Sequence, residues 1–304
     1  MKSADGHKMP LLRICALILL LPCSLARADQ PAHFAVMDGR TGELLLASSA
    51  ETPLHPAWLT QMMVLYVAFT ALETGRVSMD DTVIVSAHAA SQAPPRLGLA
   101  DGQAIPVAEL VTAVALRHST DAATALAEAV SGSESAFVAE MNDMADAMCL
   151  TDTHFRNVQG WTDPLHTMSA QDAAIVARFL MHDFADHYPL FSQQHAWASG
   201  RDITSYQRRE FVAVTGVDGL STSYSEEGGY SGVYSAERNG DRVRVIVSIF
   251  AETSVSRRVE QATNLLGQGF ALATDNAQTI PPELWNCRKT LSEAPPFAGR
   301  QSEG

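Results

Sequence analysis

Lysine is nearly absent from this chain of 304 residues, which holds 3 lysines against 18 arginines. Lys2, Lys8 and Lys289 lie near the two ends, so residues 9–288 contain none. A general preference for arginine explains the exposed positions, because both side chains carry a positive charge. The absence still excludes a catalytic lysine amine anywhere inside residues 9–288.

Long apolar runs are also scarce, and the one at the start is short. An apolar stretch over residues 14–22 follows basic residues, and Ala26-Arg27-Ala28 supplies a small-x-small cleavage pattern. The stretch is shorter than the about 20 residues that span a bilayer. Residues 1–28 are therefore predicted to be a signal peptide that directs export to the periplasm, with translation beginning at Met1 or Met9.

Positive charge is scarce in the predicted mature chain. Removal of residues 1–28 leaves 17 basic against 33 acidic side chains, a formal charge of −16. Such a surface repels phosphate backbones and anionic lipid headgroups, so we expect no nucleic-acid partner. No later segment has the length and hydropathy of a membrane span, so we expect no membrane anchor after cleavage.

Only two cysteines, Cys149 and Cys287, remain after the predicted cleavage, too few for a disulfide framework. Cys149 follows an apolar helical segment, so a buried free thiol is the favoured interpretation. Export also permits a disulfide between the two cysteines. Both possibilities stay open at this point.

The order of predicted elements indicates an α+β domain over residues 29–272. Alternation predicts an opening hairpin, and helical spacing predicts a mostly helical middle before strands return. The predicted strands cover 33–37, 43–47, 229–237 and 242–250, and the predicted helices cover 62–72, 107–116, 122–130, 137–148, 169–181 and 256–270. The strand pattern resumes from Val217, and Asn239-Gly240 is predicted to be the turn of the last hairpin. The helix over 62–72 is apolar nearly all round, as expected of a buried helix, and Ser169 with Asp172 three residues on is a capping-box-like helix start. This order favours an antiparallel sheet flanked by helices, with a helical insertion. The proline-rich residues 273–304 are predicted to be a tail.

Residues 55–66 read His-Pro-Ala-Trp-Leu-Thr-Gln-Met-Met-Val-Leu-Tyr. They resemble the Pro-Ala-Ser-Leu-Thr-Lys-Met-Met stretch of the serine-type D-alanyl-D-alanine carboxypeptidases, small penicillin-binding proteins that trim peptidoglycan stem peptides. In that family the serine attacks and the lysine three residues on takes its proton. Here Trp58 stands at the serine position and Gln61 at the lysine position. An indole has no nucleophilic oxygen, an amide takes up no proton near neutral pH, and the larger ring is expected to fill the cleft.

A second segment, residues 117–123, resembles the family's Ser-x-Asn-Asp-Ala-Ala. Anchored on Asp121 and the two alanines after it, the resemblance puts His118 at the serine position and Thr120 at the asparagine position. A shift by one residue would align Ser119, Thr120 and Asp121 instead, but the flanking sequence disfavours it.

A third segment, residues 216–225, resembles the family's Gly-Val-Asp-Gly-x-Lys-Thr-Gly-Tyr-Thr. Ser221 replaces the lysine, Thr222 keeps the threonine, and Ser223 replaces the glycine. The resemblance implies that the lost lysine would have helped to hold the substrate's terminal carboxylate. A Cβ at Ser223 crowds the approach of a substrate backbone. Backbone donors beside Tyr224 and the tryptophan could still form an oxyanion hole, but with no acyl-enzyme to stabilise.

The resemblance covers about residues 33–272 and implies the serine β-lactamase/penicillin-binding-protein-like transpeptidase fold, without the C-terminal β domain or membrane helix of some members. It implies neither a cofactor nor a metal. Because all three motifs have lost reactive groups, we expect a pseudoenzyme that binds or regulates in the cell envelope, with a peptidoglycan stem peptide or an envelope protein as partner. The expected ligand-binding residues are Trp58, His118, Thr120, Thr222 and Tyr224. Trp58 either closes a dead cleft or offers a stacking platform.

Two other functions stay open. One is a live hydrolase with a relocated nucleophile, in which His118 serves as base for Ser119 or Thr120, although neighbouring helical residues diverge. The other is a structural envelope protein without a ligand. The remaining histidines are scattered, and only His182 and His187 have a spacing that a metal site would use, so ordinary surface or core roles are expected for them.

Overall fold

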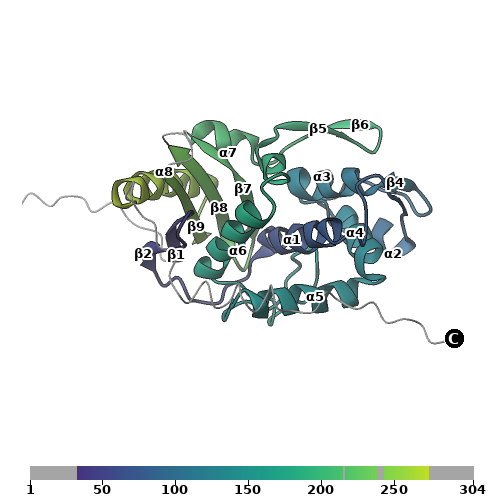
Figure 1. The fold of residues 1–304 in the computed structure, drawn as a ribbon, viewed down its shortest axis with the longest axis horizontal. Helices are drawn as coiled ribbons and strands as arrows, with labels where there is room; N and C mark the ends of the chain where they lie inside the picture. Colours follow the sequence, from purple (N-terminus) through teal and green to yellow (C-terminus); the bar gives the residue numbers. More distant parts are fainter. Residues whose placement is uncertain (1–32, 215, 239–242, 274–304) are drawn as a thin grey trace, which may run out of the picture. The chain divides into compact units, whose positions relative to one another are not determined.

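The computed structural model describes residues 33–214, 216–238 and 243–273, which belong to one compact unit (Figure 1). A five-stranded antiparallel sheet has the order β2-β1-β9-β8-β7. Its strands are β1 (His33–Asp38), β2 (Leu44–Ser48), β7 (Val217–Ser225), β8 (Gly229–Arg238) and β9 (Val243–Glu252). The predicted hairpin and late strands are confirmed. The predicted turn at Asn239-Gly240, the signal peptide and the tail beyond Ala273 lie outside the described residues.

The sheet has an apolar core on each face. Alternate residues of β1 enter different cores, because successive side chains of a strand point to opposite faces. Phe34 and Val36 pack with Leu265 of α8 (Val255–Leu272), which covers one face. Ala35 and Met37 join the larger core, which includes α6 (Ala170–Asp183) on the other face. The predicted cap of α6 is confirmed, since the Ser169 hydroxyl accepts a hydrogen bond from the N–H of Asp172 at 3.1 Å.

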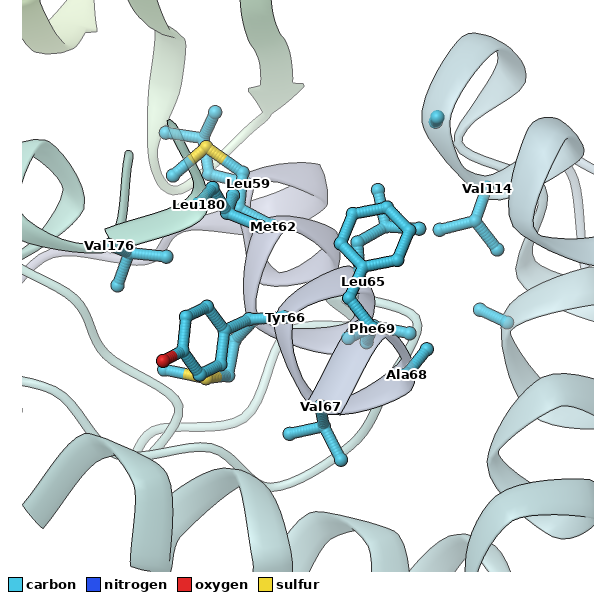
Figure 2. Packing of buried hydrophobic residues seen from close by; sticks show 14 of the residues in the cluster. Leu59, Met62, Leu65, Tyr66, Val67, Ala68, Phe69, Val114, Val176 and Leu180 are labelled. Atoms are coloured by element: carbon cyan, nitrogen blue, oxygen red, sulfur yellow. The ribbon is translucent and has the colours of Figure 1, made fainter. Parts of the chain in front are cut away.

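A helical subdomain surrounds α1 (Thr60–Glu73), which is buried on nearly every side, as its all-round apolar sequence predicted. Figure 2 shows Met62, Leu65 and Val67 extending from α1 in different directions, with Val114 on one side and Val176 on the other. The remaining helices of this region are α3 (Val107–Arg117), α4 (Thr120–Ser131) and α5 (Glu134–Ala147). The start of α1 is therefore fixed by packing on several elements.

Several short elements escaped the sequence analysis. They are η1 (Ala57–Leu59), β3 (Thr82–Ile84), α2 (Ala87–Ala90), β4 (Ala104–Pro106), η2 (Tyr188–Ser192), β5 (His195–Ala198), β6 (Arg201–Thr204) and α7 (Arg208–Ala213). Strands β3 and β4 pair with each other, as do β5 and β6, outside the main sheet. Elements this short display too few periods of alternation to be recognised. No helix in the described segments combines the length and hydropathy needed to cross a membrane.

The favoured interpretation of Cys149 as a buried free thiol is wrong. Cys149 is exposed and takes part in a disulfide; the other cysteines of the chain lie outside the described residues. Its φ of 57° is left-handed, so the chain reverses after α5 and the side chain turns outward. Met148 and Leu150 on either side stay buried, which explains why an apolar sequence context misled the prediction.

Candidate functional site

Trp58 lies in η1, directly before α1, and is half-buried. The turn that presents it is tightly held. Ala57 has a left-handed φ of 47°, and a Cβ added at Gly160, whose own φ is 82°, would overlap the Ala57 carbonyl oxygen. The hydroxyl of Ser223 on β7 donates a hydrogen bond to the carbonyl oxygen of Pro56 at 3.0 Å. The turn that carries the indole is thus held by two distant segments, which contact it at Gly160 and Ser223.

Three aromatic rings follow one another at this site. The Trp58 ring stacks on His118, with centroids 5.6 Å apart and planes 15° apart. His118 in turn lies 6.1 Å from the ring of Tyr206 at 30°. The guanidinium carbon of Arg117 lies 4.3 Å from the Tyr206 centroid, and its Nη2 donates to the Tyr206 hydroxyl at 3.1 Å. Offset ring contacts of this kind add to the stabilisation that burial provides.

Gln61 lies one helical turn after Trp58 and is only 2% exposed. Its Nε2 donates to the backbone carbonyl of His118 at 3.2 Å. Its Oε1 is buried and has no hydrogen-bond partner among the described residues. Residues three apart share a helix face, so the structure brings Trp58, Gln61 and His118 together. None of their side-chain atoms is a nucleophilic oxygen or a strong base.

His118 caps the end of α3 in a left-handed conformation, with φ 52°. Gln207 Nε2 lies 3.0 Å from His118 Nε2, and the Ser205 hydroxyl donates to Gln207 Oε1 at 2.7 Å. These contacts assign Gln207 as donor, so Nε2 of a neutral His118 accepts and Nδ1 carries the proton. Nδ1 is buried and has no partner within the described part of the chain.

Burial, and secondly the positive charges of Arg258 and Arg117, lower the pKa of His118 to about 3. At neutral pH the imidazole is therefore uncharged and a weak base. The structure also separates it from one of the two hydroxyls considered for a relocated site. The Thr120 hydroxyl lies 2.6 Å from the carbonyl oxygen of Ala93 and 2.9 Å from that of Pro95, and donates to them. Thr120 thus joins α4 to the preceding loop.

The residues predicted on β7 divide into two sets. Ser221 and Thr222 are 3% and 6% exposed, and β7 packs against η1. No hydrogen bond joins their side chains to the Trp58–His118 pair within the described residues. Tyr224 is 43% exposed and packs on Tyr230, with centroids 4.5 Å apart. The structure therefore leaves Tyr224 outside the ring stack.

A buried ion pair behind β7 was missed by the sequence analysis. Arg258 of α8 pairs with Glu210 of α7, and its Nη1 donates to the carbonyl oxygens of Ser223 at 2.7 Å and Ser231 at 2.6 Å. The Tyr234 hydroxyl donates to the other Glu210 oxygen at 2.7 Å. This network holds β7 against β8. The sequence carries no signal for it, because the two charged residues are 48 positions apart.

Two pairs of a hydroxyl and an imidazole lie near η1. Thr60 Oγ1 is 2.9 Å from His166 Nε2, and both residues are fully buried. Burial, and secondly the charge of His55, lowers the pKa of His166 to about 3. His55 Nδ1 lies 3.1 Å from the hydroxyl of Ser225, which also accepts the Gly228 N–H at 2.8 Å. Only the His55–Ser225 pair is partly exposed, so only this hydroxyl has access to solvent.

The two histidines with metal-like spacing lie in different surroundings. His182 Nε2 lies 2.7 Å from the Gly39 carbonyl oxygen. His187 stacks on Phe69 at 4.6 Å and lies 3.4 Å from a carboxylate oxygen of Glu73. No three potential metal ligands gather anywhere in residues 33–214, 216–238 and 243–273.

Comparisons with known proteins point to one family. A family model described as D-alanyl-D-alanine carboxypeptidase matches residues 26–253. The chain is 30% identical over 299 residues to D-alanyl-D-alanine carboxypeptidase DacF of Bacillus subtilis, covering 94% of this chain and 74% of that protein. It is 32% identical over 244 residues to D-alanyl-D-alanine carboxypeptidase DacD of Escherichia coli, covering 78% of this chain and 62% of that protein.

Solved structures of penicillin-binding proteins superpose on this chain. Penicillin binding protein 5 from Haemophilus influenzae superposes with a TM-score of 0.76 and 27% identity, over 80% of this chain and 71% of that one. Penicillin binding protein 6B from Escherichia coli superposes with a TM-score of 0.74 and 28% identity, over 82% and 80%. The predicted penicillin-binding-protein-like transpeptidase fold is confirmed, and the chain belongs to the D-alanyl-D-alanine carboxypeptidase family.

Proposed function

We propose that this protein is a catalytically inactive member of its family, which binds peptidoglycan stem peptide in the periplasm without cleaving it. The observation that carries the proposal is the Trp58–His118 stack at the start of α1. A ring stands where the family resemblance requires a hydroxyl, and Gln61 stands one turn later with an amide. The predicted signal peptide supports the location.

The electrostatics of the site favour the same conclusion. A serine becomes nucleophilic when a neighbouring base takes its proton. Residues 9–288 contain no lysine, and the low pKa of His118, about 3 through burial, makes this imidazole a poor substitute. A binding role requires only that part of the former substrate surface stays accessible.

A fluorescent penicillin provides the direct test, because the drug acylates the nucleophilic serine of an active family member. The purified mature protein is expected to show no covalent label, while an active carboxypeptidase treated in parallel is labelled. Intact-protein mass spectrometry should likewise show no added mass. A stoichiometric adduct mapped to any residue of the domain overturns the proposal.

The His55–Ser225 pair favours one alternative, a hydrolase with a relocated nucleophile. Its hydroxyl and imidazole are 3.1 Å apart, which is within reach of proton transfer. This alternative predicts hydrolysis of a diacyl-D-Ala-D-Ala peptide that Ser225→Ala abolishes. His118→Ala tests the other relocated base in the same assay. Absence of turnover in the unmodified protein removes both versions.

A structural envelope protein without a ligand is the remaining alternative. Calorimetry with stem-peptide fragments separates it from the proposed function. Measurable heat and a raised melting temperature support binding, whereas neither heat nor a thermal shift favours the purely structural role.

A further inference from the structure

An open groove of about 680 Å³ lies beside the ring stack and is lined by three arginines, Arg117, Arg208 and Arg209. The other lining residues are Thr204, Ser205, Tyr206 and Val212. The groove is formed by the end of α3, the end of β6 and helix α7, which lie near one another in Figure 1. None of the residues predicted at the three motif positions lines it.

The three arginines carry positive charge that no described carboxylate neutralises. Arg117 donates to neutral oxygens, the Thr204 carbonyl at 3.5 Å and the Tyr206 hydroxyl. Arg208 Nε donates to the side-chain oxygen of Gln194 at 3.3 Å. Within the described residues no ion pair involves Arg117, Arg208 or Arg209.

The acidic residue nearest to these arginines in the sequence does not neutralise their charge. Glu210 follows Arg209 directly, but it is buried and bonded to Arg258 and Tyr234. Elsewhere on this acidic protein arginines meet carboxylates, as Arg76 does with Glu140 at 3.0 Å. Three like charges around one groove repel one another, and an anion placed among them removes that cost.

The chemistry of the groove selects for carboxylates on a ligand with some apolar surface. A guanidinium presents a planar fork of donors that matches a carboxylate with two parallel hydrogen bonds. Tyr206 is 44% exposed and Val212 is 71% exposed, so both offer apolar contact. The volume falls within the range of about 300–1,000 Å³ that is common for small-ligand sites.

We propose that this arginine groove binds a short peptide through two or more carboxylates, and that it is the place where the stem peptide is held. The identity of the peptide rests on the proposed function, whereas the site itself rests on the groove. A ligand against Tyr206 touches the first ring of a stack that ends at Trp58. Its binding should therefore change the fluorescence of Trp58.

The test uses calorimetry of the mature protein with a synthetic stem peptide, before and after its carboxylates are converted to amides. We expect the amidated peptide to bind at least about tenfold more weakly, since charge-assisted hydrogen bonds are lost. The variant R208Q/R209Q removes two exposed side chains and should weaken the free peptide by a similar factor. The variant R96Q/R201Q removes the same charge from exposed arginines outside the groove and should bind like the unmodified protein.

The outcomes separate the two proposals. Equal affinity of R208Q/R209Q and the unmodified protein overturns the groove but leaves stem-peptide binding in place. If only an acidic peptide of L-residues binds, and binds through the arginines, the groove stands and the proposed ligand fails. Binding of neither peptide overturns both. A fluorescence change that persists in W58F overturns the contact with the ring stack.

Discussion

The indole of Trp58 lies face to face with the imidazole of His118, 5.6 Å away and tilted by only 15°. The contact joins the turn before α1 to the last turn of α3, two segments that meet nowhere else through their side-chain rings. The family resemblance places Trp58 and His118 at reactive positions of two different motifs, so this one contact occupies both positions. The stack fills space between these segments.

Replacement of Trp58 by Ala should remove this packing. We expect a loss of about 2–4 kcal/mol in the free energy of unfolding, less than the about 3–5 kcal/mol for truncating a fully buried ring, because Trp58 is half-buried. Trp197 is 65% exposed on the β5–β6 hairpin, so W197A should change stability by less than about 0.5 kcal/mol. Urea denaturation of both variants measures the difference. Equal losses would show that the stack contributes nothing.

The close approach of Gly160 to η1 predicts a position that tolerates no side chain. In G160A the new Cβ would overlap the backbone of Ala57, so we expect a loss of at least about 3 kcal/mol. Gly132 has a similar φ of 77° but no atom within 4 Å of an added Cβ. G132A should therefore cost only the about 1–2 kcal/mol of a left-handed alanine. Thermal denaturation of the pair distinguishes overlap from backbone preference.

Arg258 and its neighbour Arg257 offer a matched test of the buried ion pair. R258M leaves the Glu210 carboxylate buried without a charge partner, and we expect a loss of about 3–5 kcal/mol. Arg257 lies nearer the surface, so R257M should cost at most about 1 kcal/mol. Denaturant titrations measure both. The double variant E210Q/R258M should regain part of the loss, and a strictly additive result would contradict the assignment.

The buried histidines predict that acid weakens the fold. The pKa of His118 and that of His166 are lowered to about 3 in the folded protein, chiefly by burial. Unfolded histidine takes up a proton below about pH 6.5, so between these values the unfolded chain binds more protons. Stability should consequently fall as pH drops from about 6.5 toward 3.

Asp172 contributes to the pH dependence of stability in the opposite sense. Burial raises its pKa to about 6, so below that pH the folded state holds a proton that the unfolded state releases, and acid stabilises the fold through this group. H118Q should remove the contribution of His118 and leave those of His166 and Asp172 in place. Urea midpoints at pH 7, 6, 5 and 4 should therefore decline less steeply in H118Q than in the unmodified protein. Parallel curves would exclude His118 as a source of the acid sensitivity.

Cys149 leads to a prediction about the mature chain. After the predicted signal cleavage, Cys287 is the one other cysteine in the sequence. The unreduced mature protein should bind no thiol reagent, and reduction should release two thiols. Peptide mapping without reduction should recover a cross-linked fragment containing Cys149 and Cys287. A freely alkylated Cys149 in the unreduced protein would contradict the bridge.

The sequence was sufficient for the elements that have long periodic patterns. The all-round apolar helix α1, the cap at Ser169 and the strands of the main sheet follow from spacing that a single chain displays. The family resemblance also put Trp58 and Gln61 on one face of a helix start, and the structure places both against His118.

The parts that could not be predicted depend on distant pairs and on local backbone reversals. The contact of His118 with Tyr206 requires the left-handed end of α3, and the pair of His55 with Ser225 joins residues 170 positions apart. The outward turn of Cys149 has the same origin as the turn of His118, a single left-handed residue after a helix. Neither kind of feature leaves a periodic trace in a sequence.

Under the proposed function, the hydrogen bond from Ser223 to Pro56 limits what a single substitution at the site can restore. It ties strand β7 to Pro56, two residues before Trp58. A hydroxyl introduced at position 58 would therefore still lie beside a strand that is held against this turn. An amine at position 61 would gain nothing while the indole remained. Under the proposed function, we therefore expect neither W58S nor Q61K alone to produce turnover.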